Sequence, residues 1–90
     1  MDRRYQQNPA IEAATLEQGL MLLEPEARKF CALNATSSLI WSKLEQASST
    51  PQIAEAVTSS FSGISSTEAL SDVEAIVMEM AALGLVILVE

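Results

Sequence analysis

Few residues in this sequence could perform chemistry. There is no histidine and a single cysteine, Cys31, so a serine or cysteine nucleophile would lack its commonest general base. The segment Gly63-Ile64-Ser65-Ser66 does not fit the G-x-S-x-G pattern of a nucleophile elbow. The sequence has no glycine-rich phosphate loop, and without histidine it has no zinc-ligand cluster. These observations predict a protein that is not an enzyme and has no catalytic residue, metal or cofactor.

Two remaining candidates have simpler interpretations. Cys31 falls in a predicted strand, where a small buried apolar side chain is a better interpretation than a reactive thiol. Ser38-Leu39, near a predicted helix start, is the closest match to the phosphopantetheine site of a carrier protein. Ser37 stands where such motifs have an acid, and a preceding hairpin does not suit a four-helix carrier. Neither feature predicts a reaction.

Charge and composition restrict the class of partner. The chain has 90 residues, 49% of them apolar, and only six glycines and prolines, which is typical of one folded domain. All five basic residues precede Leu44, while the segment from Leu44 onward holds seven acids and no base, and the net charge is −7. Such a surface repels phosphate backbones, so nucleic acid is not an expected partner.

The ends of the sequence show no targeting or membrane signal. Residues 1–9 are polar and contain no apolar signal-peptide core. The apolar stretch 75–89 is shorter than a bilayer requires and carries Glu79. We therefore expect a cytoplasmic protein with a flexible segment at 1–7 and one domain at 8–90.

The first third of the chain is predicted to be extended. Residues 10–14 fit a short strand, and the runs around Glu24-Pro25-Glu26-Ala27, which reads as a turn, predict a hairpin over 20–32. In its second strand, Lys29 and Cys31 would share one face of the sheet. Residues 85–89 fit a further short strand.

Three helices are predicted to follow the hairpin. Asn34 is the expected N-cap of the first, and Thr50, followed by Pro51, that of the second. Ser65-x-x-Glu68 predicts a capping box for the third, and Gly84 its end. The helices should have about twelve, eleven and seventeen residues. The sequence thus predicts an α+β fold: a winged helix-turn-helix with a small N-terminal antiparallel sheet followed by three helices.

The third predicted helix suggests binding. Val77 belongs to its buried apolar stripe, and Glu74, Met78 and Ala81 adjoin that stripe. A flexible thioether on a half-exposed face suits an adaptable groove, and a strand edge beside such a helix can accept a peptide as an added strand.

In its order and spacing of motifs, the chain resembles the PqqD-like domains, also called RiPP recognition elements, which are peptide chaperones of ribosomally made, modified peptides. The resemblance covers about residues 8–88. Its motifs are Asn8-Pro9, the hairpin LMLLEPEARKFCALN, Leu33-Asn34, Ile40-Trp41, Thr50 with Ile53-Ala54, Val57 and Phe61, Asp72-Val73, and Leu83-Gly84-Leu85-Val86.

The resemblance implies that the leader segment of a precursor peptide binds as an extra strand, against the third strand and beside the third helix. In this sequence those elements map to residues 28–32 and 70–83. The leader would then be presented to a modifying enzyme, such as a radical SAM enzyme or another maturase, and the founding family member serves pyrroloquinoline quinone biosynthesis. The expected peptide-binding residues are Arg28, Lys29, Phe30, Cys31, Ala32, Glu74, Val77, Met78 and Ala81.

Two other functions compete with peptide binding. A structural module, either a homodimer or a docking domain for an enzyme, would use the apolar third helix and the 85–89 tail. A DNA-binding winged helix is the other alternative, but residues 50–61 contain no basic side chain for its recognition helix.

Overall fold

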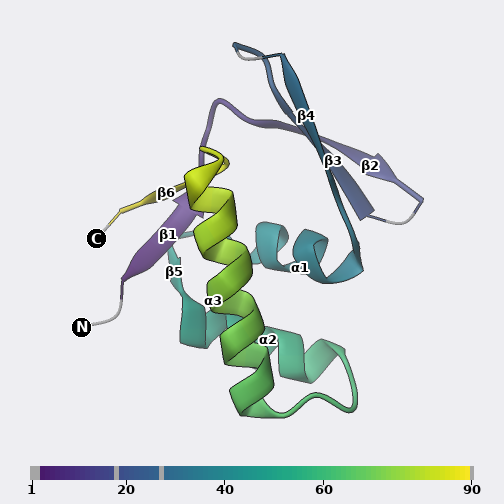
Figure 1. Cartoon of the computed structure of the whole chain (residues 1–90), viewed down its shortest axis with the longest axis vertical. Helices are drawn as coiled ribbons and strands as arrows, with labels where there is room; N and C mark the ends of the chain where they lie inside the picture. The colour runs from purple at the N-terminus through teal and green to yellow at the C-terminus, as the bar shows by residue number, and fades with distance from the viewer. Residues whose placement is uncertain (1–2, 18, 27, 90) are drawn as a thin grey trace.

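The computed structural model describes residues 3–17, 19–26 and 28–89. Two small sheets and three helices make up the fold, with the helices below and between the sheets (Figure 1). This arrangement confirms the predicted α+β class.

The first sheet has the order β2-β3-β4 and is antiparallel throughout. β2 spans Glu12–Leu16, β3 spans Gly19–Glu24 and β4 spans Lys29–Leu33. β3 and β4 contain no β-branched residue, so their extended form depends on pairing and on burial of Leu22 and Leu33, and each loop between neighbouring strands is at most four residues long. The hairpin predicted over 20–32 is therefore confirmed. The predicted turn includes Ala27, which lies outside the described residues.

The second sheet has the order β5-β1-β6 and joins three distant parts of the chain. β1 spans Arg4–Gln7, β5 spans Ser48–Ser49 and β6 spans Val86–Leu88. Tyr5 is paired with Ser48 on one side and with Leu88 on the other. Residues 4–7 therefore form a central strand, so the prediction that residues 1–7 are flexible is wrong for this part.

The helices begin at side-chain caps. α1 is Ala35–Lys43, α2 is Thr50–Ser60 and α3 is Ser66–Ala82. Asn34 accepts from the Ser37 N–H at 2.8 Å, as predicted. Ser65 caps α3 by accepting from the Glu68 N–H at 3.2 Å, but the Glu68 carboxylate accepts from the Ser65 hydroxyl at 3.1 Å instead of from its backbone N–H, so the predicted capping box does not form. The second cap is Ser49 instead of Thr50, because Ser49 and Gln52 form a reciprocal capping box.

Other predicted boundaries shift by one to three residues. α1 has nine residues instead of about twelve, because the chain turns at Leu44. The strand predicted at 10–14 lies at Glu12–Leu16, and the one at 85–89 is limited to Val86–Leu88. α2 and α3 have the predicted lengths of 11 and 17 residues. Gly84, with φ of 77°, ends α3 as expected.

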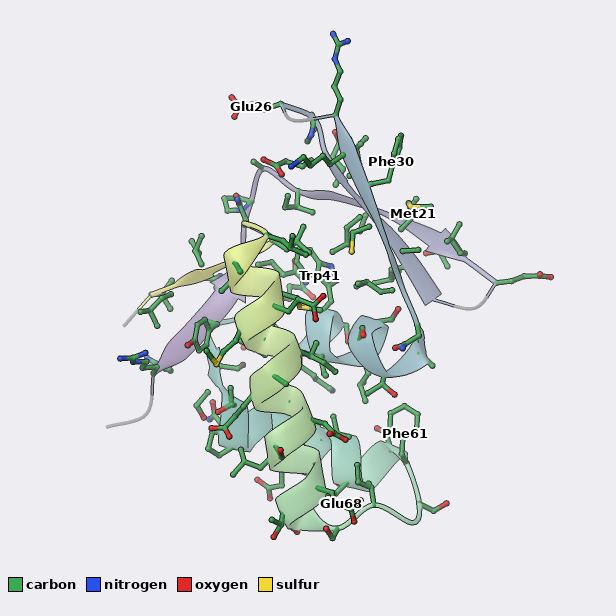
Figure 2. The ribbon with its side chains drawn as sticks, in the orientation of Figure 1. Met21, Glu26, Phe30, Trp41, Phe61 and Glu68 are labelled. Atoms are coloured by element: carbon green, nitrogen blue, oxygen red, sulfur yellow. The ribbon has the colours of Figure 1, made fainter. Side chains whose placement is uncertain are left out.

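The core lies where the helices meet the inner face of the first sheet. Trp41, which is only 4% exposed, packs there with aliphatic side chains from every helix. Figure 2 shows Trp41 in the middle of the molecule. The largest fully buried side chains are Leu22, Ile40, Leu44, Ile53, Val57, Val73 and Val77. Because Leu22 belongs to β3 and Val73 and Val77 belong to α3, this core fixes the position of the helix beside the sheet.

Candidate functional site

β4 is an edge strand with one unpaired side. It pairs with β3, and no other described strand pairs with it. The Leu20 N–H donates to the Ser38 hydroxyl at 3.0 Å, and this hydroxyl donates to the Leu33 carbonyl at 3.3 Å, so Leu20 and Leu33 face each other across the ladder. Peptide groups alternate in direction along an antiparallel strand. The N–H and C=O groups of Phe30 and Ala32 therefore point to the open side.

Two adjoining hollows lie between this edge and the C-terminal half of α3. They have volumes of about 230 and 130 Å³, and Cys31, Leu83 and Leu85 line both. The larger hollow extends to Leu22, Glu24, Lys29, Phe30 and Ala82. The smaller extends to Ala32, Leu33, Ser37, Ile76, Glu79 and Met80. Together they form a groove parallel to the open backbone edge, which we call the β4 groove.

The chemistry of the β4 groove suits an extended peptide with apolar side chains. Its walls are mainly aliphatic, and Leu83 is 52% exposed although it lines both hollows. A strand added to β4 would point every second side chain toward the helix, into these hollows. Glu24 and Lys29 place one charge of each sign at the larger hollow, and Glu79 places a negative charge at the smaller one. The groove can therefore bind the backbone of an extended peptide, its apolar side chains and charged side chains near the hollows.

No cluster of three or more His, Cys, Asp or Glu side chains among the described residues could hold a metal ion. Likewise, no helix in the described part of the chain is long and apolar enough to cross a bilayer.

Five of the predicted peptide-binding residues lie at or next to the open edge. Lys29, Phe30, Cys31 and Ala32 belong to β4, and all four line the β4 groove. Arg28 was expected to begin the strand, but it lies in the preceding turn with φ of 54°. Its left-handed backbone ends the turn one residue later than predicted.

The predicted residues of α3 do not meet this edge. Glu74, Val77 and Met78 line a separate hollow of about 410 Å³ with Arg3, Tyr5, Thr50 and Pro51, beside β1 and α2. The Val77 side chain is fully buried, and Ala81 is partly buried against the core. The structure therefore does not bring these four residues together with β4 in one groove, and their contact with a peptide stays a prediction.

The reason is rotation around the helix. With 100° per residue, Val73, Val77 and Met80 mark the buried stripe of α3. Ile76 and Leu83 lie on one flank of that stripe and face β4, whereas Glu74 and Met78 lie on the other flank. Both flanks contain apolar residues, so the sequence alone did not show which of them faces the strand.

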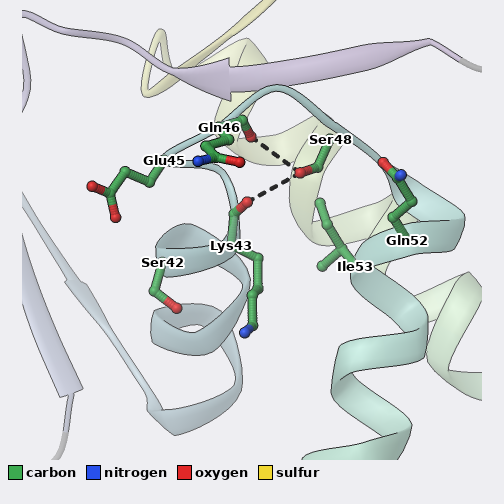
Figure 3. Close-up of a pocket in the computed structure, with 7 residues that line it drawn as sticks. All are labelled: Ser42, Lys43, Glu45, Gln46, Ser48, Gln52 and Ile53. Atoms are coloured by element: carbon green, nitrogen blue, oxygen red, sulfur yellow. Dashed lines mark hydrogen bonds between the residues drawn. The ribbon is translucent and has the colours of Figure 1, made fainter.

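A polar hollow at the end of α1 has a structural explanation. It measures about 390 Å³ and is lined by Ser42, Lys43, Glu45, Gln46, Ser48, Gln52 and Ile53 (Figure 3). The Ser48 hydroxyl lies 3.2 Å from the Lys43 carbonyl oxygen and 3.1 Å from that of Gln46. These contacts satisfy carbonyl groups at the helix end and in the turn toward β5. We assign this hollow to the connection between α1 and β5.

Comparison with known families identifies the fold. The family model of PqqD, described as coenzyme PQQ synthesis protein D, matches residues 19–86. The chain belongs to the PqqD family. The matched segment begins at β3 and ends at the first residue of β6, so it contains both walls of the β4 groove.

Two solved structures share the fold of this PqqD-family chain. One, "Lasso peptide synthetase B1 complexed with the leader peptide", has 26% sequence identity and a TM-score of 0.81, and the match covers 92% of this chain and 96% of that one. The other, "TbiB1 in Complex with the TbiA(beta) Leader Peptide", has 22% identity and a TM-score of 0.80, with 90% and 93% covered. The second likeness concerns the fold alone. No curated protein matches the chain.

Proposed function

We propose that this chain is a non-catalytic peptide chaperone. It binds the leader segment of a ribosomally synthesised precursor peptide as an added strand on β4 and presents the peptide to a modifying enzyme. The observation that carries this proposal is the open edge of β4 lying directly beside the apolar hollows of α3. The solved structure that is 26% identical to this chain is described as a complex with a leader peptide, which supports leader binding by this fold.

The binding mode follows from the geometry of the edge. The outward N–H and C=O groups of Phe30 and Ala32 would form the backbone hydrogen bonds, which are independent of the leader sequence. Apolar side chains entering beside Cys31 and Leu83 would select the leader. Tethering the leader raises the effective concentration of the attached core peptide at the enzyme, so the chaperone itself performs no chemistry.

The cellular setting is part of the proposal. The partners are a precursor peptide and a maturase, for example a radical SAM enzyme, and the complex works in the cytoplasm. Nucleic acid is not a partner, because α2 and α3 carry no basic residue.

The domain begins at Arg4 instead of residue 8, since β1 is the central strand of its sheet.

A proline substitution in β4 tests strand addition. In Ala32→Pro, the outward N–H is replaced by a ring that cannot donate, while the hydrogen bonds to β3 are kept. Ala13→Pro is the matched control, because Ala13 lies on β2, the other edge strand of the same sheet. The N–H and C=O groups of Ala14 point toward Met21 of β3, so those of its neighbour Ala13 point away from the sheet. Each variant would be ¹⁵N-labelled and titrated with synthetic leader peptides of the precursors encoded near the gene.

We expect Ala32→Pro to weaken leader binding by roughly tenfold or more, equivalent to about 1.4 kcal/mol, and Ala13→Pro to leave it within about twofold. Amide shifts in the unsubstituted protein should concentrate in residues 29–33 and 76–85. Shifts spread over β2, or equal losses in both variants, would contradict leader binding at β4.

A second function, homodimerisation, is favoured by one observation. Among the described strands β6 is also an edge strand, and its residues Ile87 and Leu88, with Val89 directly after them, are 41%, 52% and 39% exposed and uncharged. Such an edge can pair with a second copy. Sedimentation velocity distinguishes the two functions: a tight dimer lost in Ile87→Lys would favour dimerisation through β6, whereas a monomer excludes it.

A further inference from the structure

The outer face of the β2-β3-β4 sheet is apolar and faces away from the helices. Strand alternation and register place one set of side chains on this face: Ala14 and Leu16 of β2, Met21 and Leu23 of β3, and Phe30 and Ala32 of β4. Phe30 is 72% exposed and Leu16 is 43% exposed. Figure 2 shows Met21 and Phe30 on the side of the sheet away from Trp41. We call these six residues the outer face.

No described part of the chain covers the outer face. Leu20 and Cys31, on the inner face of the same strands, pack against the core, whereas Met21, Leu23 and Phe30 are not among the side chains packed there. Leu22, which lies between Met21 and Leu23 in β3, points to the inner face and is 1% exposed. The outer face is therefore an apolar surface with no partner among the described residues, which makes it a candidate interaction surface.

The charge around the outer face argues against a second copy as its occupant. Glu12 lies on the same face at the end of β2, Glu17 follows Leu16, and both are exposed. The cations near this face among the described residues are Arg28 in the hairpin turn and Lys29, which lies on the inner face of β4, and the whole chain carries a net charge of −7. Two copies would bring like charges together, whereas a partner with a basic rim would be attracted.

The size of the outer face also favours a reversible hetero-complex. Three strands about 4.8 Å apart and five residues long cover roughly 14 by 17 Å, or around 240 Å². A stable interface needs about 800 Å² from each partner. The outer face alone is therefore too small for a permanent dimer, but it is large enough for the centre of a transient interface with a charged border.

We propose that the outer face docks the peptide-modifying enzyme, through an apolar patch on the enzyme that is bordered by lysine or arginine side chains. The choice of partner rests on the proposed function. A leader paired with β4 would extend the same sheet by one strand, so its outward side chains would lie beside Phe30 and Ala32. The enzyme then contacts chaperone and leader together, and it binds the loaded chaperone more tightly than the empty one.

The test measures binding of the full chain to purified modifying enzymes encoded in the same gene cluster, with and without leader peptide. The key variant is Leu16→Ser combined with Met21→Ser, because neither side chain lines the β4 groove. Leu88→Ser is the matched control, since Leu88 is an exposed leucine of similar accessibility on the other sheet. Glu12→Lys tests the charge without removing an apolar side chain.

We expect the double variant to weaken enzyme binding by about tenfold or more and to leave leader affinity within about twofold. Leu88→Ser should retain enzyme binding. Glu12→Lys should slow association with the enzyme, because it removes a negative charge that attracts the basic border. High salt should weaken enzyme binding by the unsubstituted chain for the same reason.

Three results would overturn the docking proposal: no enzyme binding by the unsubstituted chain, equal losses in the double variant and in Leu88→Ser, or a dimer of the free chain that the double variant disrupts. Leader affinity is measured separately from enzyme binding. If the unsubstituted chain does not bind the leader, the proposed function is refuted. If it binds the leader but not the enzyme, only the assignment of the outer face is refuted.

Discussion

The two flanks of α3 each border a hollow, but only one borders a free strand edge. On one flank, Ile76 and Leu83 face β4, whose outer side is unpaired among the described strands. On the other, Glu74 and Met78 share a larger hollow with Tyr5 of β1, and β1 is paired on both sides by β5 and β6. Strand addition requires unpaired backbone groups beside the helix, and only the β4 flank offers them among the described strands. The volume of the hollows alone would favour the flank opposite to the one we propose.

The largest effect should come from removing the support that both flanks share. Trp41→Ala deletes a side chain that is 4% exposed, and cavity formation should lower the free energy of unfolding by about 3–5 kcal/mol. Chemical denaturation followed by circular dichroism measures this loss, with Trp41→Phe as the milder control. An unchanged unfolding midpoint in Trp41→Ala would show that the indole does not hold the core together.

A smaller effect is expected at the base of the β4 side alone. In Gly19→Ala, the added methyl would collide with the Leu33 carbonyl oxygen and lie 2.7 Å from the Ser38 hydroxyl, at a φ of 155°. The backbone strain alone costs roughly 1–3 kcal/mol. Hydrogen exchange should show faster opening of β3 and β4 than of β1.

Gly63→Ala is the matched control for that substitution. Gly63 also has a positive φ, 83°, but an added methyl would meet nothing within 4 Å. It therefore carries backbone strain without a clash, and equal losses of stability in both variants would show that the close approach of Gly19 to Leu33 is unimportant.

The smallest change compares the two flanks directly. Leu83→Ser removes an apolar wall of the β4 groove, and we expect leader affinity to fall by about tenfold. Met78→Ser alters a more accessible side chain on the opposite flank, 68% exposed against 52% for Leu83, and should change leader affinity by less than about twofold. Isothermal titration calorimetry with one leader peptide measures both. The reverse order would restore the flank that the sequence had suggested.

Local signals in the sequence predicted the elements whose causes are local. Asn34, Ser65 and Gly84 act within one helical turn, so their caps could be identified without the fold. The hairpin was equally local. β1 was missed because Arg4-Tyr5-Gln6-Gln7 has no apolar alternation, and its extended form comes from pairing with residues more than 40 positions away.

The candidate site could be predicted on its strand but not on its helix. Lys29 to Ala32 follow from the position of the hairpin before α1. The helix contribution depends on the angle at which α3 packs, which Leu22, Val73 and Val77 set together in the core. No signal in the sequence distinguishes the groove residues Ile76, Glu79 and Leu83 from those on the other flank of α3. The sequence shows the apolar stripe of the helix but not which of its flanks meets a strand.

The pairing of β1 with β6 also fixes when the protein can fold during synthesis. Tyr5 pairs with Leu88, and the Asn8 side chain and backbone donate to Gly84 and Leu85, so β1 can pair with β5 early but completes its sheet only after β6 has been translated. The β2-β3-β4 sheet and α1 leave the ribosome much earlier. Their open edge and outer face are thus exposed before α3 arrives, and contacts this distant in sequence form slowly. The β4 groove needs α3 and Leu85 as its second wall, so on the proposed function a nascent chain cannot enclose a leader peptide there before these residues have been translated.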